Sequence, residues 1–489
     1  MARAATTPEG GAGEEFAPEP PTKYLPPMPY AEMPPSEPLR KVLGPSVILA
    51  GIGVGSGEYI LWPYITTQIG VGFLWAALIG VTMQYFLNME IERYTLATGE
   101  TAITGFSRFW RPWGLVMLVC AFVPNVWPGW ATSGATTLTF LFGLSEDSAP
   151  YIALVALIAI GITLTVSPVV YNAMEKAEFA KVGLVIVFLA VAVVSAISGA
   201  AWAEVPKIVT SPIGPGALDP ALVLGALAFA GAGGVNNLVQ SNWIRDKGFG
   251  MGQYVPRIVS PFTGEEEAKP STGNMIRQDE QSLTRWSEWW RVANIEQLVS
   301  FWLICFLSIS LFSLLAFSTV GVNPIAEDPN LDFVKAEGEE LATVVGPWFQ
   351  TIFWAIGTIS LLLVALGVTD YVSRVFADVL KTEYMRDHRL SESQIYAIVV
   401  WSLITLSTII MFTVSSQPVV LLVVSASLSG VVMFVYSILL IQLNRGALPD
   451  TIKLGGWRLG VMAFAVVFYG FFSGWYLIVK VPELLGGGG

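Results

Sequence analysis

Eleven apolar segments, each about as long as a membrane-crossing helix, most strongly constrain the fold of this chain. They cover residues 44–69, 72–97, 113–142, 150–170, 180–202, 220–245, 292–321, 346–378, 394–413, 417–442 and 457–480. A helix needs about 20 mostly apolar residues to cross the hydrocarbon core of a bilayer. Only 13% of the 489 residues are charged, about half the share of a soluble domain. The sequence therefore predicts an all-α, multi-pass membrane protein that has the lipid bilayer as its surroundings.

The basic residues are distributed unevenly among the connecting segments. If the N-terminus is cytoplasmic, only Lys207, Lys335 and Lys480 of the 26 Lys and Arg residues are external. Membrane proteins retain Lys and Arg on the cytoplasmic side. The pattern predicts a plasma (cytoplasmic) membrane protein with a cytoplasmic N-terminus and an external C-terminus. A net charge of −11 gives no indication of a nucleic-acid partner.

The two ends of the chain and one long connection between spans have predictions of their own. Residues 1–43 are rich in Pro and Glu, have no apolar run, and predict a disordered cytoplasmic tail. Residues 246–291 predict a long cytoplasmic loop whose aromatic end forms an interfacial helix before the seventh span. Residues 481–489 predict a short external tail. The two cysteines, Cys120 and Cys305, lie in separate apolar segments, and we interpret them as small buried hydrophobic residues.

Glycine clusters occur in the first and sixth spans. In the first span, four glycines alternate with other residues over 51–57, and the sixth span holds Gly231, Gly233 and Gly234. Each glycine costs a helix about 1 kcal/mol relative to alanine. Interrupted helices at corresponding positions of two halves are typical of a transporter site. The pattern predicts a repeat of five plus five helices, over 44–202 and 220–442, with 457–480 as an extra helix. Close helix packing also explains such glycines.

Glu58 follows the first glycine cluster at mid-membrane depth. A charged side chain there costs about 2.5 kcal/mol or more unless it is paired or solvated. We therefore expect Glu58 to face a cavity and to bind a cation, carry a proton, or both. A structural hydrogen bond to the end of an interrupted helix is the alternative.

Several motifs in the first two spans resemble the Nramp family of divalent-metal transporters. They are Gly44-Pro45, Gln68-Ile-Gly70, Leu74-Trp75, Gln84-Tyr85 and Ala97-Thr98-Gly99. The resemblance implies a LeuT-like fold with helices 1 and 6 interrupted, and cation transport that is often coupled to protons. The chain is thus similar to a distant, Nramp-related branch.

This branch departs from the family at the metal-binding motifs. Where the family has Asp-Pro-Gly-Asn, the chain has Gly55, Ser56, Gly57 and Glu58, and Gly234 stands in place of the family's methionine. The resemblance places the substrate site at Gly55, Ser56, Glu58, Gly231, Gly234, Asn236 and Asn237, with Glu58, Asn236 and Asn237 as metal ligands. Oxygen ligands without sulfur suit Mg²⁺, Ca²⁺ or a monovalent ion.

The proton pathway of the family is also altered. Trp127 and Trp130 occupy the positions of an acidic pair in the third helix, where they are candidate gate residues. Glu58 and Asp370 are then the carboxylates available for proton transfer inside the membrane. Asp370 and Arg374 also have the spacing of an ion pair on one helix face.

Two functional hypotheses follow. The first is a secondary active transporter of a divalent cation such as Mg²⁺ or Mn²⁺, working by alternating access around the two interruptions. The second keeps the fold and moves a monovalent ion, an amino acid or another small organic molecule. A channel would need a continuous polar lining, and we find no nucleophile–base pair or histidine cluster typical of an enzyme. The sequence indicates no cofactor.

Overall fold

The computed structural model describes residues 15–166, 170–255, 272–323, 330–385 and 388–484. Within these ranges, nine helical segments are long and apolar enough to cross a membrane. The two predicted spans outside that set are the glycine-containing ones, at 45–69 and 220–247. The eleven predicted spans therefore all correspond to helices, and the protein is a multi-pass helical membrane protein.

The spans are formed, in order, by α2 (Pro45–Ser56), η1 (Gly57–Leu61) and α3 (Trp62–Ile69); α4 (Trp75–Thr98); α6 (Pro112–Asn125) and α7 (Gly129–Phe142); α8 (Ala149–Val166); α9 (Val170–Ser195); α12 (Pro220–Ala228) and α13 (Val235–Lys247); α14 (Glu280–Gln297), η6 (Leu298–Leu303) and α15 (Ile304–Thr319); α17 (Pro347–Val379) and η8 (Leu380–Tyr384); α18 (Glu392–Thr413); α19 (Pro418–Gly446); and α20 (Gly456–Leu484). Shorter elements are β1 (Tyr30–Ala31), α1 (Leu39–Val42), η2 (Val71–Phe73), α5 (Ala102–Phe109), η3 (Glu146–Ser148), α10 (Gly199–Glu204), α11 (Lys207–Thr210), η4 (Pro215–Ala217), η5 (Gly250–Tyr254), β2 (Met275–Ile276) and α16 (Asp332–Val344).

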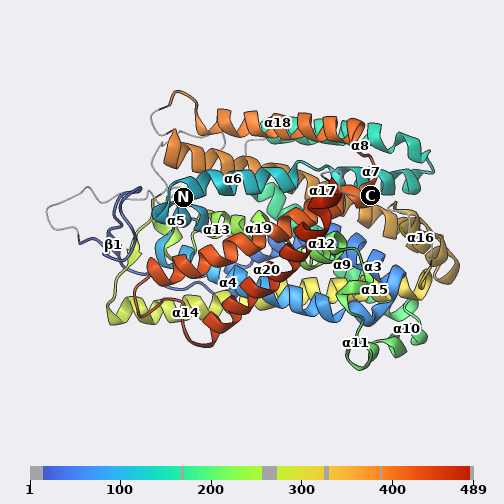
Figure 1. The fold of residues 1–489 in the computed structure, drawn as a ribbon, viewed down its shortest axis with the longest axis horizontal. Helices are drawn as coiled ribbons and strands as arrows, with labels where there is room; N and C mark the ends of the chain where they lie inside the picture. The colour runs from blue at the N-terminus through green and yellow to red at the C-terminus, as the bar shows by residue number, and fades with distance from the viewer. Residues whose placement is uncertain (1–14, 167–169, 256–271, 324–329, 386–387, 485–489) are drawn as a thin grey trace.

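The long helices lie along the longest axis of the molecule, with β1 near one end and the end of α20 towards the other (Figure 1). α2 packs against α9 and α17, α12 packs against α19 and α20, and α3 packs against α15. All twelve residues of α2 are buried. A helix that is apolar and buried all round belongs in the interior of a large bundle, so the glycine-containing spans form the centre of the molecule.

The N-terminal segment differs from the predicted disordered tail. Its described part, residues 15–43, lies against the bundle, where β1 pairs in parallel with β2, and Met28 and Met33 are fully buried. Arg108 donates hydrogen bonds to the carbonyl oxygens of Pro21 and Pro26 at 3.3 and 2.9 Å. The prolines keep the segment extended, and its partners lie far away in sequence, so composition alone gave the wrong prediction.

Other boundaries also depart from the sequence prediction. The third span is divided at 126–128, because Pro128 lacks the N–H that would continue the helical ladder. At the end of the predicted loop 246–291, where the sequence predicts a helix before the seventh span, α14 begins at Glu280 and leads through η6 into that span. Residues 256–271 of that loop lie outside the described residues. In the predicted external tail, α20 extends to Leu484, and residues 485–489 lie outside the described residues.

Candidate functional site

The sixth span is unwound between α12 and α13, as its glycines predict. Gly231, Gly233 and Gly234 have φ values of +146°, +70° and +58°. Residues with a Cβ rarely adopt such angles, whereas glycine adopts them readily. α13 then begins at Val235 with Gly234 as its N-cap. The interruption frees backbone groups in the middle of the bundle, and these need partners.

Gln84 of α4 supplies several of those partners. Its amide nitrogen donates to the carbonyl oxygens of Leu227 at 3.3 Å and Ala228 at 2.7 Å, and its amide oxygen accepts from the Gly233 N–H at 3.2 Å. One side chain thus serves both sides of the interruption. Gln84 was not among the predicted site residues, although an amide side chain midway along an apolar span is the signal that could have identified it.

The first span behaves differently, because it remains helical throughout. The helix changes from α to π geometry at η1, directly after the glycines, and Gly51, Gly53, Gly55 and Gly57 keep ordinary helical angles. The first span is thus interrupted without being unwound. The interruption is a π-helical turn, a feature found frequently at functional sites.

Neighbouring groups explain why the first span needs its glycines. A Cβ at Gly57 would overlap the Phe229 carbonyl oxygen, and one at Gly55 would meet Val364 and the Ser360 carbonyl oxygen of α17. A Cβ at Gly53 would lie 2.8 Å from Glu58 Oε1 and 3.0 Å from the Gly231 carbonyl oxygen. The glycines therefore let the first span approach the unwound segment of the sixth.

Glu58 lies in η1, with 0% of its surface exposed. Neither carboxyl oxygen makes a hydrogen bond of normal geometry with a described residue. Oε1 and the Gly231 carbonyl oxygen both lie close to the Cα of Gly53, so the carboxyl group faces the interruption of the sixth span. An unmatched buried carboxylate is costly, and this one is available to a cation or a proton.

Asn236 and Asn237 occupy the first turn of α13 and are buried. Asn236 Nδ2 donates to the Ala232 carbonyl oxygen at 2.9 Å, and Asn237 Nδ2 donates to the Tyr436 hydroxyl at 3.1 Å. The Oδ1 atoms of both residues have no hydrogen-bond partner among the described residues. Two amide oxygens thus remain as acceptors on the predicted ligand residues. Ser56, also predicted, is buried at the end of α2.

The described residues contain no group of three or more His, Cys, Asp or Glu side chains placed to hold one metal ion. Any cation near Glu58 would therefore depend on backbone carbonyl and amide oxygens for further ligands. Hard cations accept such oxygen ligands.

Aromatic and basic side chains cover Glu58 on two sides. On the side of α16, Tyr59 packs against Phe312 and Phe353, with ring centroids 5.5 and 5.1 Å away. Towards the start of α2, Lys181 Nζ of α9 donates to the Gly51 carbonyl oxygen at 2.6 Å and pairs with Glu178 at 2.6 Å. With 0% of its surface exposed, Glu58 is closed to solvent in this structure.

Trp130, a predicted gate residue, stacks on Phe229 in the interruption, with centroids 5.8 Å apart. Trp127 lies in the division of the third span, and both residues line a cavity of about 20 Å³. Such a volume is close to that of one water-sized sphere. The structure brings Trp130 to the site, whereas a gating role for either residue stays a prediction.

Asp370 is engaged in a local network. Arg374 Nε donates to one carboxylate oxygen at 2.8 Å, and the Tyr396 hydroxyl donates to the other at 2.6 Å. The geometry therefore matches the ion pair expected from the i,i+4 spacing. The proposed proton-carrying role of Asp370 stays a prediction.

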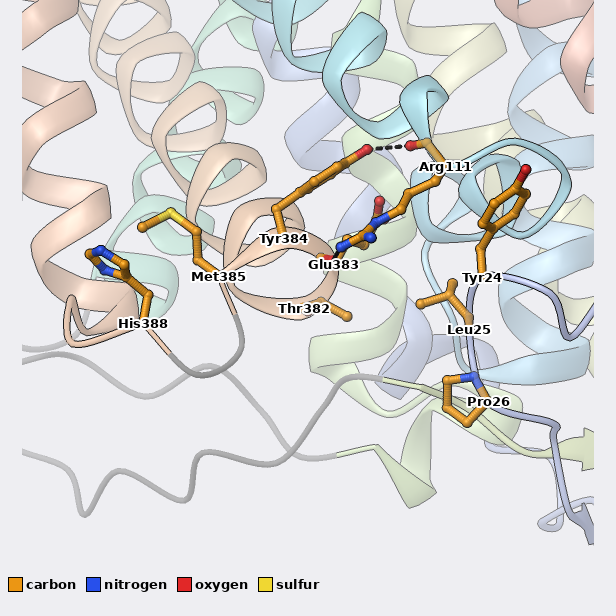
Figure 2. A pocket seen from close by; sticks show the side chains of 9 residues that line it. All are labelled: Tyr24, Leu25, Pro26, Arg111, Thr382, Glu383, Tyr384, Met385 and His388. Carbon is orange, nitrogen blue, oxygen red and sulfur yellow. Dashed lines mark hydrogen bonds between the residues drawn. The ribbon is translucent and has the colours of Figure 1, made fainter.

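A larger cavity of about 520 Å³ lies elsewhere, among the N-terminal segment, the start of α6 and the residues around η8 (Figure 2). It is lined by Tyr24, Leu25, Pro26, Arg111, Thr382, Glu383, Tyr384, Met385 and His388. None of these is a predicted site residue, so cavity size alone does not identify the site at Glu58.

No family model and no curated protein sequence matches the chain. Among solved structures, it is similar to crystal structures of the Eremococcus coleocola manganese transporter. A mutant of that transporter matches with a TM-score of 0.66 at 11% identity, over 94% of this chain and 91% of that chain. A complex with an aromatic bis-isothiourea substituted compound matches with a TM-score of 0.61 at 12% identity, over 98% and 93%. The chain therefore has the LeuT-like fold of an Nramp-type transporter.

Proposed function

We propose that this protein is a secondary active transporter of a divalent metal cation such as Mg²⁺ or Mn²⁺. The observation that carries the proposal is the buried, unmatched carboxyl group of Glu58, which faces the unwound segment of the sixth span. The similarity in fold to a manganese transporter supports the same class of substrate. The chain would represent an Nramp-related branch in which Glu58 replaces the family's usual metal-binding motif.

Charge balance explains how such a site would work. The ionised Glu58 costs about 2.5 kcal/mol or more at mid-membrane depth, and a bound cation offsets that cost. The carbonyl end of α12 carries partial negative charge and adds to the attraction. The Gly231 carbonyl oxygen lies beside Glu58, and the Oδ1 atoms of Asn236 and Asn237, which have no hydrogen-bond partner among the described residues, would be further neutral ligands.

Alternating access would open one cover of the site at a time. Opening towards the cytoplasm would separate Lys181 from the Gly51 carbonyl oxygen, and opening outwards would part Tyr59 from Phe312 and Phe353. This assignment takes the N-terminus as cytoplasmic and the plasma membrane as the location, as the distribution of Lys and Arg predicts.

A cation suits the site better than an amino acid. A carboxylate at the interruption would repel the carboxylate of an amino acid. This repulsion favours the cation over an organic substrate that carries a carboxylate.

The test is uptake of Mg²⁺ and Mn²⁺ into proteoliposomes containing the wild-type protein or Glu58→Gln. We expect saturable uptake that the substitution abolishes, while the thermal unfolding midpoint of the variant stays at or above the wild-type value. Equal uptake by the folded variant would refute the role of Glu58. Absence of uptake of either ion by folded wild-type protein would refute the proposed substrate class.

A further inference from the structure

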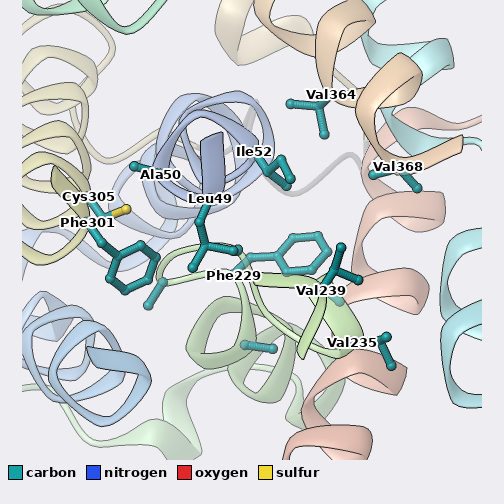
Figure 3. Packing of buried hydrophobic residues seen from close by; sticks show 14 of the residues in the cluster. Leu49, Ala50, Ile52, Phe229, Val235, Val239, Phe301, Cys305, Val364 and Val368 are labelled. Carbon is teal, nitrogen blue, oxygen red and sulfur yellow. The ribbon is translucent and has the colours of Figure 1, made fainter. Parts of the chain in front are cut away.

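Cys305 lies at the first turn of α15, in the span that packs against both α2 and η1. It is fully buried, and its sulfur atom is turned towards α2 (Figure 3). Phe301, four residues earlier on the same helix face, lies against Gly231 in the interruption of the sixth span. The helix face that carries Cys305 thus lines the site.

The Cys305 thiol is near enough to the Glu58 carboxyl group for the two to interact. A cysteine alone gives no reason to expect a ligand site, since it packs well as a small hydrophobic residue. Glu58 supplies the independent observation, because it is fully buried and both carboxyl oxygens lack a normal hydrogen bond among the described residues.

The third group at this point is the Gly231 carbonyl oxygen. It and Glu58 Oε1 lie 3.0 and 2.8 Å from the position that a Cβ of Gly53 would occupy. The absence of that Cβ leaves room for both oxygens beside Gly53. A carboxylate from the first span, a carbonyl from the sixth and a sulfur from the seventh therefore converge.

Lys181, a basic side chain whose charge acts on Glu58, does not pair with the Glu58 carboxyl group. Lys181 Nζ is held by the Gly51 carbonyl oxygen and by Glu178, each at 2.6 Å. Its charge is balanced within that pair, so the carboxyl group of Glu58 keeps its capacity to bind a further cation.

We propose that Cys305 is a sulfur ligand of the transported cation, which it binds together with Glu58 and the Gly231 carbonyl oxygen. The proposal deepens the transport function above and rests on it. A thiolate prefers borderline and soft metals over Mg²⁺ and Ca²⁺. The site would therefore select a divalent transition metal, with a cysteine of the seventh span supplying the sulfur that the sixth span lacks at Gly234.

Binding through a thiolate requires loss of the thiol proton. The metal–sulfur bond forms as the sulfur–hydrogen bond breaks, and the proton passes to water. The Glu58 carboxyl group can release a proton of its own, so the two kinds of site are distinguished by the difference in protons released between the wild type and Cys305→Ser.

The experiment compares Cd²⁺ and Mg²⁺ binding to the purified full-length protein in detergent. The variants are Cys305→Ser, Cys305→Ala and Glu58→Gln, with Cys120→Ser as the matched control on a different span. Titrations are followed by the ultraviolet charge-transfer absorption of a cadmium–thiolate bond and by calorimetry in two buffers of different ionisation enthalpy.

We expect Cd²⁺ to give the charge-transfer band and to release a proton with the wild type and Cys120→Ser. Both Cys305 variants should lose the band and that proton, and should bind Cd²⁺ at least roughly tenfold more weakly, a difference of about 1.4 kcal/mol. Mg²⁺ gains little from a thiolate, so Cys305→Ser should weaken Mg²⁺ binding less than Cd²⁺ binding.

Unchanged Cd²⁺ affinity and proton release in folded Cys305→Ser, with binding lost in Glu58→Gln, would overturn the sulfur ligand and leave the proposed function intact. Cation binding that survives Glu58→Gln would instead refute the proposed function. Thermal unfolding midpoints identify any variant that fails to fold, and the second Cys305 substitution then provides the comparison.

Discussion

The glycine clusters of the first and sixth spans look alike in the sequence, and the structure uses them in opposite ways. In the sixth span, Gly231, Gly233 and Gly234 take positive φ angles and the helix unwinds. In the first span the glycines remain helical, and neighbouring groups occupy the space where their Cβ atoms would lie. The glycines of the sixth span provide backbone freedom. Those of the first span provide close approach, which brings Glu58 next to the unwound segment of the sixth span.

The largest loss of stability is expected where a new Cβ would come closest to another backbone segment, which is at Gly57. In Gly57→Ala the new Cβ would overlap the Phe229 carbonyl oxygen, a backbone atom that cannot rotate away. We expect destabilisation by more than about 3 kcal/mol and little folded protein on size-exclusion chromatography. The control is Gly183→Ala in α9, where a Cβ meets nothing within 4 Å. Similar behaviour of the two variants would contradict the close-approach account.

Substitution in the sixth span should act through backbone strain. Gly234 has φ +58° and ψ −144°, and a Cβ there would also lie 2.8 Å from Ser429. We expect Gly234→Ala to cost about 1–3 kcal/mol in backbone strain, and to lower the thermal unfolding midpoint and transport together. A variant as stable and active as the wild type would show that this turn does not need glycine.

Gln84 tests whether the unwound segment depends on a partner from another helix. In Gln84→Leu the Ala228 carbonyl oxygen and the Gly233 N–H lose their hydrogen bonds, and leaving a buried group unmatched costs about 1–3 kcal/mol. We expect a lower unfolding midpoint for this variant than for Leu78→Ala, which alters an exposed side chain of the same helix. Equal midpoints would mean that other groups stabilise the interruption.

The smallest effect is expected at Gly51. A Cβ there would overlap a carboxyl oxygen of Glu178, but this is the end of a flexible side chain and can move. We expect Gly51→Ala to cost about 1 kcal/mol, at the low end for overpacking, and to weaken the contact of Lys181 with the Gly51 carbonyl oxygen. The unfolding midpoint should fall much less than in Gly57→Ala. A larger fall than in Gly57→Ala would contradict the proposed ranking of the glycine substitutions by destabilisation.

Hydropathy was sufficient to predict the spans, and the glycine cluster to predict the interruption of the sixth, because each depends on a local stretch of sequence. The geometry of the first span was not predictable in this way. Glycine is favoured both where a helix unwinds and where another chain segment approaches, and only the position of Phe229 decides between the two. The placement of Trp130 at the interruption likewise needed the tertiary fold.

Cys305 and the N-terminal segment also could not be placed from the sequence alone. Cys305 reads as a small hydrophobic residue in an apolar run, and its relation to Glu58 arises only when the first and seventh spans pack together. The N-terminal segment has the composition of a disordered tail, yet Met28 and Met33 are buried through contacts with distant parts of the chain. Such contacts leave no periodic pattern in the sequence.

The most direct test of the central claim is a calorimetric titration of Mn²⁺ into purified wild-type protein and Glu58→Gln in the same detergent. Because the carboxylate supplies the charge of the site, we predict saturable binding to the wild type and none to a variant that elutes and unfolds normally. Equal Mn²⁺ affinity in the two proteins would contradict the account, and would place the cation site away from the junction of the first and sixth spans.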